Sequence, residues 1–128
     1  MEHLEKYNQR YLAFAKFTPI NFEDIVNSVP EEKHYWITEL SKKEHERQNL
    51  LKAKKKIKDA LIQDVIDNGI VSLNKQTLDN LEYDVKLDNV KTKLEIVEEV
   101  IIYLERIIKN VTFIGQDIKN IINLKQLE

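Results

Sequence analysis

A short lysine run is the part of this 128-residue sequence whose residue types and spacing most clearly predict chemistry. Residues 42–58 contain eight Lys or Arg residues against two Glu residues, although the whole chain has a net charge of −2. Consecutive lysines spread around a helix, which suits contact with phosphates in any sequence and does not suit base reading. The candidate phosphate-binding residues are Lys52, Lys54, Lys55, Lys56 and Lys58, followed by Lys42, Lys43 and Arg47. A solvated, charged helix face is the alternative interpretation.

No other group of side chains predicts a reaction. His3, His34 and His45 are scattered and the chain has no Cys, so neither a metal site nor a cofactor is expected. The acidic pairs 31–32 and 98–99 are adjacent residues, expected on outer faces, and adjacent helical residues diverge. No Gly-rich phosphate loop is present, so we expect a protein that is not an enzyme.

The lysines lie on a long predicted helix. A capping box over residues 28–31 with Pro30 in the first turn predicts its start, and Asn68-Gly69 predicts its end. A helix over residues 31–67 would be roughly 55 Å long at the usual rise per residue. Residues 41–49 include no apolar side chain, so this part is expected to be wet.

A heptad stripe from Leu87 to Ile122 predicts a second long helix, with only Gly115 interrupting its first column. A third apolar column makes the stripe wider than a two-stranded seam requires. We therefore expect an all-α, mostly helical fold in which long helices form an oligomeric bundle or ring. Packing of the stripe within its own subunit remains the alternative. The predicted subunit-interface residues are Leu94, Val97, Ile101, Leu104, Ile108, Val111 and Ile118.

The N-terminal region predicts a short amphipathic helix ending before Thr18-Pro19, with Asn21 as a cap for a following helical turn. Its apolar face would lie in a core or interface, or would stack nucleic-acid bases. A connection over residues 70–76 and a cap at Thr77 precede the last helix. The stripe of the first helix is Leu4, Tyr7, Tyr11, Phe14 and Phe17.

Length and composition predict one domain over residues 1–128 with few loops, since the chain has two Gly and two Pro residues. The absence of Cys fits a reducing compartment. Neither a signal peptide nor a membrane-spanning run is evident, so we expect a soluble, intracellular protein.

Two stretches, residues 30–69 and 94–124, resemble the recombination mediator proteins of T4-type bacteriophages, the UvsY family. The first has Tyr35-Trp36 near the start of a long helix, then a lysine-dense turn, then Gly69. In the second, the family's order is matched by Glu98-Glu99-Val100, Tyr103-Leu104-Glu105, Ile107-Ile108-Lys109 and Ile118-Lys119-Asn120.

The resemblance implies a mostly helical protein that forms rings of several subunits and binds single-stranded DNA without sequence preference. It also implies two protein partners in the cytoplasm of an infected host cell: a phage recombinase and the single-stranded-DNA-binding protein that this recombinase displaces. The family's DNA-contacting region corresponds to Lys54–Lys58, whereas its aromatic residues before the Gly are replaced here by Asp64–Asp67. A structural helical oligomer, such as a phage assembly or scaffold subunit, is the alternative.

Overall fold

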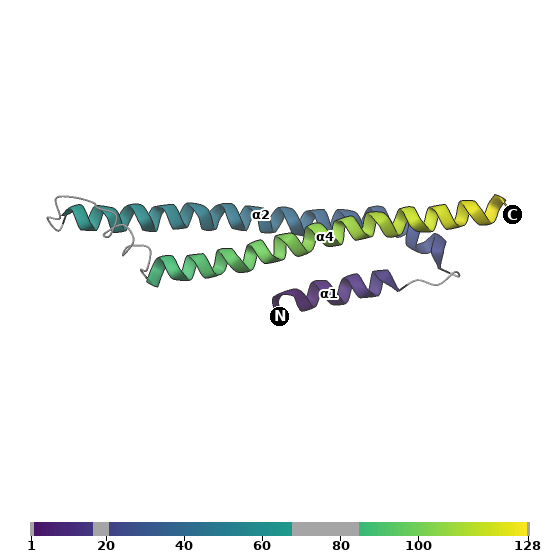
Figure 1. Ribbon diagram of the computed structural model, residues 1–128, viewed down its shortest axis with the longest axis horizontal. Helices are drawn as coiled ribbons and strands as arrows, with labels where there is room; N and C mark the ends of the chain where they lie inside the picture. Colours follow the sequence, from purple (N-terminus) through teal and green to yellow (C-terminus); the bar gives the residue numbers. More distant parts are fainter. Residues whose placement is uncertain (1, 17–20, 68–84, 128) are drawn as a thin grey trace. The chain divides into compact units, whose positions relative to one another are not determined.

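The computed structural model describes residues 2–16, 21–67 and 85–127, which form three helices (Figure 1). These are α1 (Glu2–Ala15), α2 (Phe22–Asp67) and α4 (Val85–Leu127). No strand occurs in these ranges, so the predicted all-α fold is confirmed. The predicted connection over residues 70–76, the Thr77 cap and Phe17 lie outside the described residues.

Residue contacts divide the chain into two compact units. Unit 1 comprises Met1–Lys42 with Val100–Glu128, and unit 2 comprises Lys43–Glu99. Helices α2 and α4 run antiparallel and each contributes to both units (Figure 1). The single domain expected from chain length stays a prediction.

Helix α2 begins at Phe22, so the predicted start near residue 31 is wrong. The Ile25 N–H donates to the Asn21 carbonyl at 3.0 Å, which closes the first turn. The Ser28 hydroxyl donates back to the Ile25 carbonyl at 2.8 Å and does not cap a helix. Burial of Ile25 in the core of unit 1 favours helix before the capping box, so Pro30 lies inside α2.

The core of unit 1 is an apolar cluster supplied by all three helices. Trp36 and Leu104 are fully buried, and Tyr7 and Phe14 of α1 are almost as inaccessible. The aromatic face of α1 therefore belongs to the core, and its interpretation as a base-stacking surface is wrong. The buried members of the cluster are Tyr7, Phe14, Ile25, Trp36, Val100, Leu104, Ile107, Val111 and Ile118.

The heptad stripe of α4 is buried within the single chain, which agrees with the alternative interpretation of this stripe. Leu94 and Val97 are buried in unit 2. In unit 1, Ile108 packs partly buried against the core, whereas the stripe is fully covered at Ile101, Leu104, Val111 and Ile118. Oligomerisation and the predicted subunit-interface residues stay a prediction.

Gly115 lies at a close approach of α4 to α2 in unit 1. A Cβ atom built on Gly115 would lie 3.0 Å from Cγ2 and 3.2 Å from Cγ1 of Val29. A larger residue would require the Val29 side chain to shift, so the break in the heptad column fits the packing at this point.

We predict that Leu104→Asp unfolds unit 1, because Leu104 is 0% exposed and a buried, unpaired carboxylate costs several kcal/mol. Ile102→Asp is the matched control, since Ile102 lies two residues away and is 51% exposed. Circular dichroism with urea titration measures the difference. Full helicity and unchanged unfolding of the Leu104 variant would contradict this packing.

Candidate nucleic-acid interface

The lysine run lies on α2 within unit 2, as the sequence predicts for a helical segment. Lys52, Lys55 and Lys56 are exposed, and no hydrogen bond or ion pair is found for them among the described residues. At 100° per residue, these three lysines lie within an arc of about 100° around the helix, so they share one exposed face of α2. They can meet phosphates that approach this face.

Other cations share a partly buried face of α2 in unit 2. Lys43, Arg47, Lys54 and Lys58 follow the three-to-four-residue spacing of one helix face and are all partly buried. Lys54 and Lys58 therefore differ from the exposed Lys52, Lys55 and Lys56 of the same run. Leu50, Ile57 and Leu61 lie on this face as well.

This face of α2 carries long cationic side chains at positions where a packed helix face usually has apolar residues. In unit 2, α4 buries Leu87, Leu94 and Val97, whereas no α2 side chain in this unit is fully buried. Lys and Arg stems cover apolar surface while their charged ends reach water. Packing in unit 2 thus keeps a row of positive charge beside an apolar seam.

Arg47 is the most embedded of these cations, because its Nε is buried without a hydrogen-bond partner among the described groups. Residues 41–49 were expected to be exposed to solvent, and burial of the Arg47 Nε is an exception to that expectation. Lys43 is also partly buried, with 28% of its side chain exposed. The other residues of this stretch are exposed, as the lack of apolar side chains predicts.

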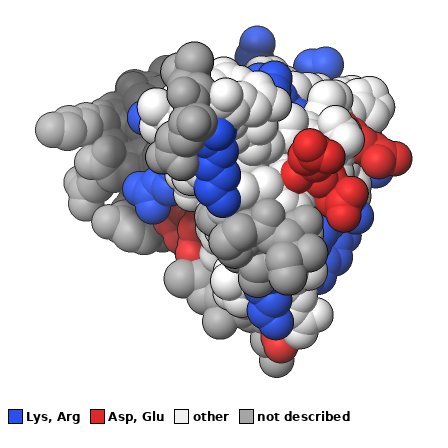
Figure 2. Space-filling model, turned by 90° about the vertical axis from the view of Figure 1, so that its right-hand side faces the viewer, with Lys and Arg blue, Asp and Glu red and all other residues white. Residues whose placement is uncertain are grey.

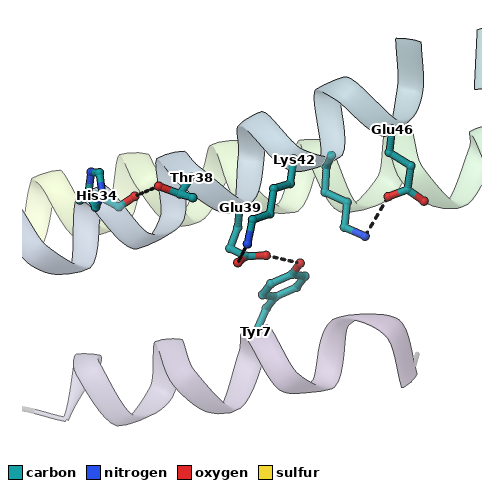
Figure 3. A network of polar contacts seen from close by, with 7 residues as sticks. Tyr7, His34, Thr38, Glu39, Lys42 and Glu46 are labelled. Atoms are coloured by element: carbon teal, nitrogen blue, oxygen red, sulfur yellow. Dashed lines mark hydrogen bonds and ion pairs between the residues drawn. The ribbon is translucent and has the colours of Figure 1, made fainter. Parts of the chain in front are cut away.

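Two of the predicted phosphate-binding residues that precede the lysine run form ion pairs. The Lys42 Nζ lies 3.3 Å from Glu39 Oε1, and the Lys43 Nζ lies 3.1 Å from Glu46 Oε2 (Figure 3). Each pair joins residues one helical turn apart, which neutralises part of the local charge. Lys52, Lys55 and Lys56 are therefore the most available of the predicted phosphate ligands.

On the face that Figure 2 presents, the visible Lys and Arg side chains lie in several separate places, and uncharged and acidic residues are also at the surface.

A polar contact that the sequence analysis missed joins α1 to α2 in unit 1. The Tyr7 hydroxyl donates to Glu39 Oε2 at 3.1 Å, and the Lys42 ammonium approaches the other oxygen of the same carboxylate (Figure 3). Only 13% of the Glu39 side chain is exposed. The contact is charge-assisted and ties the buried aromatic face of α1 to the middle of α2.

Glu32 forms a second link between the same helices. Its carboxylate accepts a hydrogen bond from Arg10 at 3.0 Å and another from the Trp36 indole N–H at 3.2 Å. The Arg10 guanidinium also stacks over the Tyr35 ring at 3.6 Å from its centroid. The outer-face position predicted for Glu32 is therefore wrong. Glu32 and Glu39 share a helix face with Trp36, which is the sequence signal for these contacts.

The environment of Glu39 shifts its ionisation. Burial acts to raise the pKa of the Glu39 carboxyl, but hydrogen bonds from Tyr7 and Lys42 and the charges of Lys42 and Lys6 outweigh it. The net result is a pKa below the ordinary value of 4.5. Folding therefore gains stability from ionised Glu39 above pH 4.5, and this contribution is lost as the pH falls through the lowered pKa.

The histidines and acidic side chains of the described residues do not form a metal-binding group. His3, His34 and His45 are exposed. Residues 2–16, 21–67 and 85–127 contain no group of three or more His, Asp or Glu side chains placed to hold a metal ion. None of the helices in these ranges is long and apolar enough to cross a membrane.

Comparison with known proteins does not identify a relative of this chain. No protein-family model matches the chain, and neither a curated protein nor a solved structure matches it. The function therefore has to be argued from the cations of α2 and from the way in which the helices present them.

We predict that Tyr7→Phe lowers the free energy of unfolding by about 1 kcal/mol at neutral pH, because the Glu39 carboxylate loses a donor. The loss should shrink as the pH falls through the lowered pKa of Glu39, because the carboxyl then becomes protonated and accepts more weakly. Tyr11→Phe, on the same helix, is the control. Urea unfolding at several pH values tests this, and an identical loss at every pH would show that the hydroxyl acts without Glu39.

Proposed function

We propose that this protein is a single-stranded-DNA-binding recombination mediator. It holds DNA through the α2 lysines in the cytoplasm of an infected host cell. There it helps a phage recombinase to displace a single-stranded-DNA-binding protein. The resemblance of residues 30–69 and 94–124 to the UvsY family supports this class of function.

The observation that carries the proposal is the availability of Lys52, Lys55 and Lys56. All three are exposed on one turn and a half of α2, and no acidic partner is found for them among the described residues. Unpaired ammonium groups release counterions from DNA without first breaking an ion pair. Lysine also tolerates a phosphate backbone whose position varies, because its charge sits on a flexible stem.

A mediator needs contacts that are weak singly and strong together. Three available lysines per chain bind weakly, and a ring of several subunits would multiply them through effective concentration. Each contact can then be released singly while the recombinase takes over the strand. Since the sequence contains no nucleotide-binding loop, the energy of the handover comes from the recombinase.

A structural helical oligomer is the second candidate, and one observation favours it. Ile102, Phe113 and Leu124 are exposed at intervals of eleven residues along α4. Eleven residues make just over three turns, so these side chains share one face. Such an exposed apolar face is suited to helix–helix contacts between subunits.

We predict that Lys52→Ala, Lys55→Ala and Lys56→Ala together weaken binding of every single-stranded DNA sequence alike. Loss of three phosphate contacts should flatten the plot of log affinity against log salt by about 2 per engaged subunit. Fluorescence anisotropy with short labelled oligonucleotides measures both quantities. The matched control removes the same charge from exposed positions of α4 with Lys93→Ala, Arg106→Ala and Lys109→Ala.

We also predict that the intact protein shortens the lag before recombinase filaments form on coated single-stranded DNA. Recombinase ATP turnover reports the lag, and the triple-lysine variant should lose most of the effect. An equal lag with and without the intact protein would reject the mediator function and leave the structural oligomer. A full effect from the triple variant would instead move the DNA contact to other residues.

A further inference from the structure

A cleft of about 410 Å³ lies between α2 and α4 in unit 1, away from the lysine run. Its α2 wall is formed by Val26, Val29, Pro30 and Lys33. The α4 wall is polar and includes Gln116, Lys119, Asn120 and Asn123. The volume falls in the range of small-molecule sites, and the two walls differ sharply in chemistry.

The close approach of Gly115 to Val29 fixes the register of the two walls. Lys33 follows Val29 by four residues, and Lys119 follows Gly115 by four residues. Since the helices run antiparallel, each lysine lies about 6 Å from this contact in opposite directions along the axis (Figure 1). The two ammonium groups therefore flank the cleft, and neither has an ion-pair partner among the described residues.

Hydrogen-bonding groups of both kinds also line the cleft. Gln116 and Asn120 each offer an amide N–H₂ donor and a carbonyl acceptor. The α2 wall adds the apolar side chains of Val26, Val29 and Pro30 beside Lys33.

This combination selects one class of ligand. A simple anion would use the lysines but neither the apolar wall nor the acceptors, and a neutral peptide would use the amides but not two flanking cations. A nucleotide within a strand has a phosphodiester on either side and a flat base whose edge both donates and accepts hydrogen bonds. We propose that the cleft binds one nucleotide unit of single-stranded nucleic acid, with its phosphates at Lys33 and Lys119.

The surroundings limit the length of strand that is held. A smaller hollow of about 260 Å³ adjoins the cleft and shares Val26, Lys119 and Asn123 with it. Glu23 lines this hollow, and its carboxylate repels a phosphate placed beyond Lys119. The strand therefore turns away after one unit. This inference rests on the proposed DNA-binding function and adds a second contact, in unit 1, to the lysines of α2.

The test compares Lys33→Ala with Lys119→Ala in one variant against a charge-matched control, Lys93→Ala with Lys109→Ala. Binding of labelled oligothymidylate should weaken roughly 20-fold at 0.1 M salt, and the salt slope should fall by about 1.4, which is the value for two single-strand phosphates. The control should bind like the intact protein. Unchanged affinity and slope in the Lys33/Lys119 variant would overturn the proposal.

A second variant separates base contacts from phosphate contacts. Gln116→Ala with Asn120→Ala should weaken binding without changing the salt slope, because these amides carry no charge. Wild-type affinity of this variant would overturn the nucleotide assignment and leave a site for phosphate alone. Free thymidine monophosphate should compete poorly, since it has one phosphate for two flanking cations; competition as strong as that of the strand would overturn the strand as source.

The same titrations distinguish failure of this inference from failure of the proposed function. If the intact protein binds no single-stranded DNA, both are rejected. If the triple-lysine variant of α2 loses binding while the cleft variants bind normally, only the cleft is rejected. Circular dichroism of each variant confirms that the helices are retained, since both cleft lysines lie outside the buried core.

Discussion

Burial of one face of α4 is the interaction on which the other contacts of unit 1 depend. Leu104, Val111 and Ile118 lose all or nearly all of their exposed surface to α1 and α2. Burying a side chain of this size contributes about 1.5–3 kcal/mol. The aromatic residues of α1 and the indole of Trp36 pack on this face, so the polar contacts around them exist only because the apolar surface is covered first.

Polar contacts then select one arrangement of α1 on this apolar base. Apolar contacts alone would tolerate rotation or sliding of a short helix, since they are not directional. Glu39 accepts from Tyr7, and Glu32 accepts from Arg10 and Trp36, so each carboxylate has its own donors. The lowered pKa of Glu39 has the same origin, because the hydrogen-bond donors that hold α1 in this arrangement stabilise the ionised carboxylate.

Unit 2 is built differently, with consequences for ligand binding. Its α2 face places Lys43, Arg47, Lys54 and Lys58 where unit 1 would place apolar residues. Their stems give less apolar burial than Leu or Ile would, so this unit gives up stability to hold positive charge near its seam. That exchange is typical of binding surfaces, where residues that suit a partner are not those that best suit folding.

The sequence by itself determined the helices and their buried faces. The heptad spacing identified the α4 residues that became inaccessible, and the spacing of Tyr7 and Phe14 identified the inner face of α1. Periodicity is sufficient here because a helical face is defined by local geometry alone. The lysine run was equally visible in the sequence, but charge alone could not separate the exposed Lys52, Lys55 and Lys56 from the partly buried Lys54 and Lys58.

Only the tertiary structure decided which elements cover one another. A capping box predicted the start of α2 at residue 31, but burial of Ile25 extended the helix to Phe22 and enclosed Pro30. Periodicity could not assign the partners of the α4 stripe, and α1 and α2 share the core of unit 1 with it. The cleft that includes Lys33 and Lys119 could not be predicted for the same reason, because its two walls are distant in sequence.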